Sequence, residues 1–317
     1  MKTRKPPSHA SWESTLECPL RCKHCGLNAG LKRPSELSTE EAKNMLSALC
    51  AFGIKNLIIS GGEFTFRKDW IEILSFSLPL FESVRVITCG WLGKKLFTEL
   101  KIIEDTSNLI ISVSLDGLEK NHDFRRGQGS FIKVLKTLES PSPIPRTVLT
   151  TVDSLNITDC PDILGLCLKL RVPLWSIQIS LPAGRMKPAL FLGKTKIQLL
   201  AEEILHWRKE FGHRIDVSPD DCFANLFPKR TWGEWSGCHA GNNLITILND
   251  GRVTGCPTMD NLIAGNVKTD SLEEIWNSEV MKNLHNEKPK ECLICGQCDG
   301  GCKAVSKLFN KQFCSPN

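Results

Sequence analysis

Three cysteines near the start of the chain have the spacing of a metal-binding loop. They lie in the run ECPLRCKHC, with three residues between Cys18 and Cys22 and two between Cys22 and Cys25. Three soft thiolates this close together can bind three corners of a cubane iron–sulfur cluster, and with no fourth cysteine nearby one iron stays open for a ligand. The spacing alone also permits a zinc site in which His24 is the fourth ligand.

A second group of cysteines lies near the C-terminus and has the C-x2-C-x2-C-x3-C spacing of a bacterial ferredoxin. In that pattern the fourth cysteine binds the neighbouring cluster. Five cysteines exceed one tetrahedral zinc site, so a zinc ribbon is the weaker interpretation and two clusters are expected. The five are Cys292, Cys295, Cys298, Cys302 and Cys314.

Composition favours metal ligation in a reducing compartment over disulfides. The 317 residues include 15 Cys, and most of these stand too close in sequence to bridge one another without strain. The segment Met1–Ala10 is basic but no apolar stretch follows it, which argues against a secretory signal. No apolar run is long enough to cross a bilayer, and the net charge of +5 is too mild for a nucleic-acid-binding surface. We therefore expect a cytoplasmic protein without a membrane or nucleic-acid partner.

These cysteines need elements that position them, and the first two thirds of the chain alternate between short β-branched runs and helical segments. The expected strands are Trp12–Leu16, Asn56–Ser60, Val84–Thr88, Leu109–Leu115, Thr147–Val152 and Ser176–Leu181. The expected helices are Thr39–Phe52, Asp69–Leu78, Lys94–Ile103, Phe131–Glu139, Cys160–Leu170 and Lys194–Phe211. Six βα units predict an α/β fold whose parallel sheet carries its active site at the C-terminal strand ends.

The alternation stops after Phe211. Leu244–Leu248 and Arg252–Thr254 flank an Asn-Asp-Gly turn and predict a β-hairpin, and a helix over Leu272–Leu284 begins at a capping box of Ser271 and Glu274. We expect a tail at residues 1–10, a barrel domain at 11–212 and a cysteine-rich domain at 213–317. Three further cysteines fall on predicted helices and are expected in the core: Cys50, Cys160 and Cys167.

With these residues in view, the chain resembles the radical S-adenosylmethionine (SAM) superfamily. That family carries C-x3-C-x-Φ-C after the first strand of a partial (β/α)6 barrel, and His24 stands at Φ. The resemblance implies a [4Fe–4S] cluster held by the three cysteines, whose open iron binds SAM. Reduction of the cluster then cleaves SAM to a 5′-deoxyadenosyl radical, which abstracts a hydrogen atom from the substrate.

Further motifs follow in register and imply contacts with SAM. Gly61-Gly62-Glu63 after the second strand resembles the GGE motif that contacts the SAM amino group. A stretch from Ser112 to Gly127 resembles SLDG…HDxxRG of peptide-modifying members. In that resemblance Ser114 lies near the SAM ribose and Arg126 reaches a carboxylate.

Four residues of these motifs leave two interpretations open. Asp116 and His122 contact the cofactor or form a structural turn. Arg185, in a P-x-GR turn, binds substrate as a catalytic-site residue or satisfies its own loop. Cys89 replaces the Asn of the Thr-Asn-Gly found in relatives, and it either packs as a small buried side chain or donates a hydrogen atom to a substrate radical.

The C-terminal part resembles the SPASM domain, which holds auxiliary clusters. Its opening pattern is matched by Cys238-x12-Gly251-x4-Cys256. The resemblance implies two auxiliary [4Fe–4S] clusters. One is bound by Cys238, Cys256, Cys302 and Cys222, and the other by Cys292, Cys295, Cys298 and Cys314.

The resemblance implies a maturase that crosslinks, epimerises or oxidises a short ribosomally made precursor peptide. Implied partners are an electron donor such as a flavodoxin or ferredoxin and a separate leader-binding protein. The alternatives are a small-molecule radical SAM dehydrogenase or decarboxylase acting on a sugar alcohol or tetrapyrrole, and a non-catalytic iron–sulfur or zinc protein. A formylglycine maturase is disfavoured because Pro257, not Asp, follows Cys256.

Overall fold

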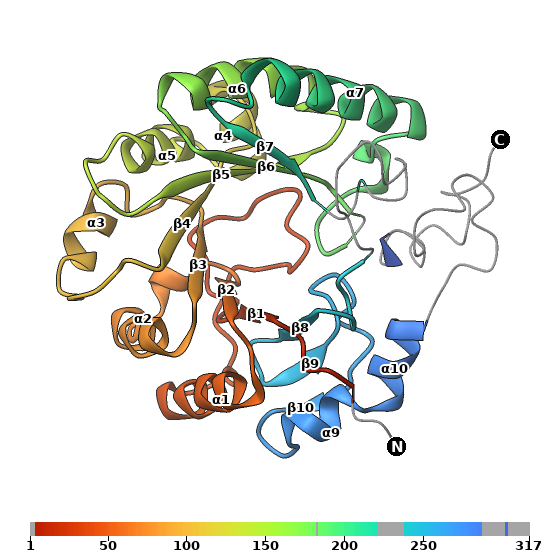
Figure 1. Ribbon diagram of the computed structural model, residues 1–317. Coiled ribbons are helices and arrows are strands. Elements are labelled where there is room, and N and C mark those ends of the chain that lie inside the picture. The colour runs from red at the N-terminus through yellow and green to blue at the C-terminus, as the bar shows by residue number, and fades with distance from the viewer. Residues whose placement is uncertain (1–3, 182, 221–222, 224–237, 287–301, 304–317) are drawn as a thin grey trace.

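The protein is built on one curved sheet whose strands are mostly parallel. The computed structural model describes residues 4–317 except 182, 221–222, 224–237, 287–301 and 304–317. Within this part, ten strands follow the order β10-β9-β8-β1-β2-β3-β4-β5-β6-β7, and all neighbours from β8 to β7 are parallel. Helices cover the outside of the sheet, and the loop after β1 lies inside its arc (Figure 1). The expected α/β partial barrel is confirmed.

The element bounds follow the predicted alternation closely. The strands are β1 (His9–Glu13), β2 (Asn56–Ser60), β3 (Ser83–Thr88), β4 (Leu109–Ser114), β5 (Arg146–Val152), β6 (Leu174–Ile179), β7 (Asp216–Pro219), β8 (Leu244–Ile247), β9 (Arg252–Thr254) and β10 (Gly265–Asn266). The helices are α1 (Thr39–Phe52), α2 (Trp70–Ser77), α3 (Lys95–Leu100), α4 (Glu119–Arg126), α5 (Ser130–Leu138), α6 (Cys160–Lys169), α7 (Lys194–Phe211), α9 (Leu272–Trp276) and α10 (Glu279–Asn286).

Alternation along the strands separates the core from the barrel interior. In β2, Leu57 and Ile59 are buried in the main hydrophobic core, whereas Ile58 and Ser60 line a central cavity. Because successive side chains of a strand point to opposite faces, one set packs against the helices and the other faces the interior. The same core contains Cys160 and Cys167, as expected, and half-buried Cys50 packs against it.

Two helices begin at a capping box, and the one predicted at Ser271 and Glu274 is confirmed. Ser38 and Glu41 exchange side-chain and backbone hydrogen bonds at the start of α1, as Ser271 and Glu274 do at the start of α9. Helix α1 ends at Gly53, whose φ of 102° is left-handed and suits glycine. These caps fix where each helix begins relative to its strand.

The first strand ends earlier than predicted. It was expected over Trp12–Leu16, but β1 spans His9–Glu13: the Ser14 amide still bonds to the last residue of β2, and two residues later the backbone bonds to a side chain instead. The Ser14 amide donates to the Ser60 carbonyl at 2.9 Å, and the Leu16 amide donates to the Glu36 carboxylate at 2.8 Å. A side chain twenty residues away therefore ends the strand, which strand propensity does not reveal.

Three elements differ from prediction for other reasons. Helix α4 was not predicted because its exposed face is charged, and β7 because it is short and ends in Pro219. The helix expected over Leu272–Leu284 breaks at Asn277 and Ser278 into α9 and α10. Trp276, the last residue of α9, is fully buried.

The predicted C-terminal hairpin extends the barrel sheet. Strand β8 pairs in parallel with β1, with Ser11 opposite Thr246, and β9 returns antiparallel beside β8. On the opposite edge β7 adds a strand beyond residue 212. The sheet therefore runs across the predicted boundary between residues 212 and 213, and the domain division stays a prediction.

The N-terminal segment expected as a tail is bound to the C-terminal part. The Arg4 guanidinium donates to the Trp276 carbonyl at 2.8 Å, and the Trp276 indole donates to the Lys5 carbonyl at 3.0 Å. Strand β1 already begins at His9. Among the helices in the described ranges, none is both long and apolar enough to span a bilayer.

Candidate functional site

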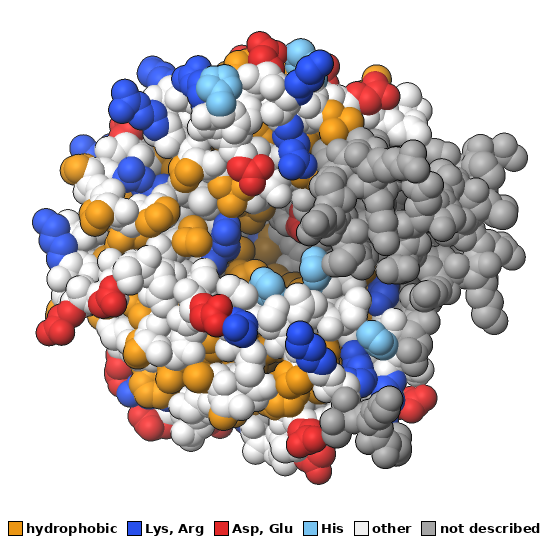
Figure 2. All heavy atoms as spheres, viewed as in Figure 1, with side chains coloured by type: hydrophobic (Ala, Val, Ile, Leu, Met, Phe, Trp, Pro, Cys, Tyr) orange, Lys and Arg blue, Asp and Glu red, His pale blue; other side chains and the backbone are white. Residues whose placement is uncertain are grey.

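A central cavity of about 480 Å³ opens inside the barrel and collects residues from both ends of the chain. Figure 2 shows it as a hollow at the centre of one face, with apolar atoms in its wall. Its lining includes most of the predicted site residues of the described part: Cys18, Cys22, His24, Cys25, Gly61, Gly62, Cys89, Ser114, Arg126, Arg185, Cys238, Cys256 and Cys302. The strand ends thus bring together residues more than 280 positions apart in sequence.

Backbone hydrogen bonds close the base of the loop that carries the first three cysteines. The Cys18 amide donates to the Gly30 carbonyl at 3.0 Å, and the Gly30 amide donates to the Leu16 carbonyl at 2.8 Å. Farther along, the Lys23 amide donates to the Arg125 carbonyl of α4 at 2.8 Å. The loop is therefore attached to the barrel at both ends and in the middle.

Arg185 holds the same loop from the opposite side of the barrel. Its guanidinium donates to the carbonyls of Cys22 at 2.9 Å and Ala29 at 2.6 Å, and its amide donates to the Cys25 carbonyl at 2.9 Å. Gly184 permits this approach, since a Cβ there would lie 2.3 Å from the Cys25 carbonyl oxygen. These contacts favour a role for Arg185 in positioning the loop over the catalytic role that was predicted for it.

The glycine pair of the GGE motif serves close approach between two chain segments. The Gly62 amide donates to the Thr15 carbonyl at 2.6 Å, and the Glu63 amide donates to the Glu17 carbonyl at 2.8 Å. A Cβ on Gly62 would lie 2.3 Å from the Glu17 carbonyl oxygen, so only glycine fits without a shift.

The Glu63 carboxylate is buried, is not part of the cavity lining and joins β2 to β3. It accepts hydrogen bonds from the Thr88 hydroxyl at 2.9 Å and from the Cys89 amide at 2.7 Å. The contact with SAM predicted for this motif therefore falls to the two glycines and the backbone, which do reach the cavity wall. It stays a prediction.

Asp116 is the centre of a buried polar network beside the loop. One of its carboxylate oxygens, Oδ2, lies 3.0 Å from His24 Nε2 and 2.5 Å from Arg126 Nε, and the other accepts from the Thr151 amide at 2.9 Å. Burial raises the pKa of Asp116, but the charge of Arg126 and the hydrogen bond from His24 outweigh it and hold this pKa well below its usual range. Asp116 is therefore an ionised structural anchor.

The same network settles how His24 and His122 are used within the described residues. Burial lowers the pKa of His24, so the ring is neutral and donates from Nε2 to Asp116. His122 accepts the Asp116 amide proton at Nδ1, at 3.1 Å, and burial lowers its pKa to about 4. For Asp116 and His122, the structural turn is the interpretation that the contacts support.

The chemistry of the loop thiols suits a cluster better than zinc. Among the described residues, no three Cys, His, Asp or Glu side chains converge closely enough to hold one metal ion, and His24 Nε2 is bonded to Asp116. A cubane instead takes its ligands at separate corners, which three thiols along one cavity wall can supply. The residues Cys18, Cys22 and Cys25 fit such a cluster.

Cys89 lies against this group of thiols. A hydrogen bond from Cys89 lowers the pKa of Cys18, and the same contact together with burial raises the pKa of Cys89 well above its usual value. Cys89 also packs with Leu20 and Cys22 in a small apolar cluster. The structure thus shows a buried protonated thiol at the cavity wall, and its role as a hydrogen-atom donor stays a prediction.

A second wall of the cavity carries cysteines of the C-terminal part. Cys238, Cys256 and Cys302 all line it, and burial raises the pKa of Cys256 to about 11. The ten cysteines in the described ranges form no disulfide with one another. The other predicted auxiliary ligands lie outside the described residues: Cys222, Cys292, Cys295, Cys298 and Cys314.

Two functional features escaped prediction from sequence. Glu36 accepts from the Thr15 hydroxyl at 2.8 Å, from the Leu16 amide at 2.8 Å and from the Arg33 amide at 3.1 Å, and so shapes the start of the loop. Glu13, at the end of β1, lines the cavity. An acidic residue within the predicted first strand was the available signal for Glu13.

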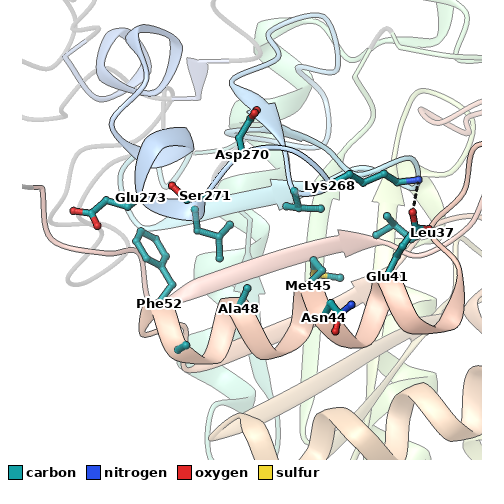
Figure 3. A pocket seen from close by; sticks show the side chains of 13 residues that line it. Leu37, Glu41, Asn44, Met45, Ala48, Phe52, Lys268, Asp270, Ser271 and Glu273 are labelled. Atoms are coloured by element: carbon teal, nitrogen blue, oxygen red, sulfur yellow. Dashed lines mark ion pairs between the residues drawn. The ribbon is translucent and has the colours of Figure 1, made fainter.

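A second cleft, of about 550 Å³, lies between α1 and residues 267–273 (Figure 3). Its floor is apolar, with Met45 and Ala48 on α1, and an ion pair of Glu41 with Lys268 at 3.1 Å crosses its rim. It contains no cysteine or histidine. The cleft therefore lacks the chemistry of the central cavity.

Comparison with known families agrees with the geometry of the central cavity. Residues 12–167 match the family model described as Radical SAM superfamily, and residues 238–299 match SPASM, described as an iron-sulfur cluster-binding domain. The chain belongs to the radical SAM superfamily. As such an enzyme it uses a [4Fe–4S] cluster that binds SAM, and its SPASM domain carries auxiliary iron–sulfur clusters.

Relatives of this radical SAM enzyme span nearly its whole length. The mycofactocin maturase MftC of Mycobacterium ulcerans is 28% identical over 96% of the chain and 84% of its own length. An AdoMet-dependent heme synthase of Methanosarcina barkeri is 26% identical over 94% and 91%. The crystal structure of Streptococcus suis SuiB bound to precursor peptide SuiA has a TM-score of 0.76 at 16% identity, covering 96% of this chain and 73% of that one, and it supports the fold.

Proposed function

We propose that this enzyme modifies a ribosomally made precursor peptide through radical chemistry. The observation that carries the proposal is the central cavity, whose two walls bear the N-terminal cysteine loop and the SPASM cysteines. A substrate between these walls lies beside both kinds of cluster. The name of the maturase MftC, similar over most of the chain, supports the same class of substrate.

The chain's own residues have separate tasks in this proposal. Cys18, Cys22 and Cys25 bind the cluster, which together with SAM supplies a radical that removes a substrate hydrogen atom. Ser114 and Arg126 line the cavity, and in this proposal they orient SAM. Cys238 and its SPASM neighbours hold an auxiliary cluster. The flavodoxin or ferredoxin donor and the separate leader-binding protein stay predictions.

The likeness to a heme synthase raises a tetrapyrrole as a second candidate substrate. A tetrapyrrole carries several carboxylates, which need cationic partners in a buried site. The basic side chains that line the cavity, within the described residues, are His24, Arg126 and Arg185. His24 is neutral, whereas Arg126 is bonded to Asp116 and Arg185 is bonded to loop carbonyls. This lining favours an uncharged peptide segment.

The test uses anaerobically reconstituted enzyme with SAM and dithionite. Synthetic peptides encoded by short reading frames beside the gene are supplied one at a time, and a carboxylated tetrapyrrole is supplied in parallel. We expect 5′-deoxyadenosine together with a modified peptide, detected by mass spectrometry and by chiral amino-acid analysis for epimers. Turnover of the tetrapyrrole with every peptide unchanged would replace the peptide proposal with the second candidate.

A further inference from the structure

Among the residues that the structure describes, buried carboxyl groups have partners, with one exception. Within the described ranges, seven Asp and Glu residues are less than a tenth exposed: Glu13, Glu36, Glu63, Asp116, Asp123, Asp153 and Asp159. Six of them accept hydrogen bonds from side chains or backbone amides. These six hold loops and strand ends, which explains why they are buried.

Glu13 is the exception. Its side chain is 3% exposed, Oε1 has no hydrogen-bond partner, and neither oxygen forms an ion pair with a residue in the described part of the chain. Burying a carboxyl group without a partner is costly, and native proteins rarely do so without a functional reason. The fold itself supplies no such reason, because Trp12 and Ala10 on the other face of β1 already pack into the core.

The place of Glu13 indicates what it faces. It is the last residue of β1, opposite Ser60 in the register with β2, and it lines the central cavity between the cysteine loop and the SPASM wall. From the β8–β9 side, Asp250, Asp260 and Arg252 act on it electrostatically. Glu13 therefore belongs to the lining of the cavity in which the substrate is proposed to bind.

A second buried atom supports a polar substrate group at this place. The Ser180 hydroxyl, which follows β6, is 3% exposed, lines the same cavity and has no partner among the described residues. Two unpaired polar side chains on separate strands of one cavity point to a ligand that carries hydrogen-bonding groups of its own.

We propose that Glu13 is a catalytic base that contacts the peptide and removes a proton from one of its thiol or hydroxyl groups. The inference rests on the proposed peptide-modifying function. The sulfur–hydrogen or oxygen–hydrogen bond of the peptide breaks, its electron pair stays on the sulfur or oxygen, and the proton forms an O–H bond on the Glu13 carboxylate. Bond formation between this atom and the carbon radical left by hydrogen abstraction releases one electron, for which an oxidised iron–sulfur cluster of the SPASM domain would be the acceptor.

The electrostatics of the site suit such a base. Burial, together with the negative charges of Asp260 and Asp250, raises the pKa of Glu13 to about 8, against a smaller opposing effect of Arg252. A base is most effective when its pKa lies near the working pH and near that of the group it deprotonates, and free thiols titrate at about 8.5. An ordinary surface carboxylate is too weak a base for this step.

The test compares Glu13→Gln with the wild-type holoenzyme, using the peptide that the assay above identifies. Glutamine keeps the shape and burial but cannot accept the proton. We expect iron content and peptide-dependent 5′-deoxyadenosine to be retained, while modified peptide per 5′-deoxyadenosine falls about 100-fold or more. Glu13→Asp, which keeps a carboxyl, restores part of the product, and Glu210→Gln on the surface of α7 is the matched control.

Three other outcomes of this test would contradict the proposal or the function on which it rests. Full product formation by Glu13→Gln would overturn the assignment of the base and leave the peptide function intact. Loss of bound iron in both Glu13→Gln and Glu13→Asp would make Glu13 a structural residue and also overturn the proposal. If the wild-type enzyme modified none of the peptides, the proposed function itself would fail, and this inference with it.

Discussion

The two cysteine-bearing walls of the central cavity are held by different kinds of interaction. Charged side chains of the barrel hold the N-terminal loop, through Arg185, Glu36 and the Asp116 network. The hairpin that carries Cys256 is held mainly by backbone pairing, since β8 pairs with β1 and the Met259 amide donates to the Cys256 carbonyl at 2.9 Å.

The two walls therefore position their cysteines by different means. The barrel positions the loop for its cluster with groups contributed from several strand ends. The SPASM hairpin instead continues the barrel sheet, so the pairing of β8 and β9 places Cys256, which follows β9 by two residues. Substitutions of single side chains should therefore disturb the front wall, which carries the N-terminal cysteine loop, more than the rear wall, which carries the SPASM cysteines.

The largest expected effect is a difference between the two walls in the reaction step that each one is required for. Cys18→Ala removes a ligand of the SAM-binding cluster and is expected to abolish SAM cleavage, by at least about 1000-fold. Cys256→Ala is expected to leave substrate-independent SAM cleavage within about threefold and to abolish modified product. Both are read by chromatography of 5′-deoxyadenosine, with iron content measured beside it. Equal loss of SAM cleavage in both variants would contradict the separation.

A pH-dependent effect is expected at Glu13, which lies between the walls. Its pKa, raised from 4.5 to about 8, means that the folded state binds the extra proton between these values. Stability therefore falls as pH rises through this window, by an upper limit of about 5 kcal/mol. Glu13→Gln lacks this loss, so its thermal midpoint should exceed that of the wild type increasingly from pH 5 to pH 8.5. A constant difference across this range would exclude a buried titrating Glu13.

The glycine pair offers a matched comparison. Gly62→Ala places a Cβ 2.3 Å from the Glu17 carbonyl oxygen in the front wall, whereas a Cβ on Gly165 in α6 meets nothing within 4 Å. We expect Gly62→Ala to lose about 3 kcal/mol and most of its bound iron. Gly165→Ala is expected to gain about 0.5–1 kcal/mol. Denaturant midpoints and iron content check both, and an unchanged Gly62→Ala variant would refute the close packing.

The smallest effect concerns Arg185. Arg185→Ala removes two guanidinium bonds to loop carbonyls and is expected to cost about 2–3 kcal/mol and to weaken SAM binding. A positioning role predicts that Arg185→Lys restores part of this binding while the Michaelis constant for the peptide stays unchanged. A change confined to that constant would instead return Arg185 to substrate contact. The exposed Arg208→Ala on α7 is the control.

How much of the fold and of the site could be predicted from the sequence depends on how far apart in sequence the interacting residues lie. The cysteine loop, the glycine pair and the helix caps are local runs, so their spacing was sufficient. Arg185 contacts residues about 160 positions away, and Glu36 ends a strand twenty positions before it, so neither follows from local pattern. Asp116 was found as a motif, but its partner in the cysteine loop, His24, needed the folded chain.

The most direct measurement follows hydrogen from peptide to cofactor. The identified precursor peptide is produced fully deuterated at carbon and supplied with unlabelled SAM to the anaerobic, reduced holoenzyme. We expect 5′-deoxyadenosine that carries one deuterium atom, formed in proportion to the modified peptide and absent in Cys18→Ala. Modified peptide formed alongside only unlabelled 5′-deoxyadenosine would contradict hydrogen abstraction from the peptide, and with it the proposed function.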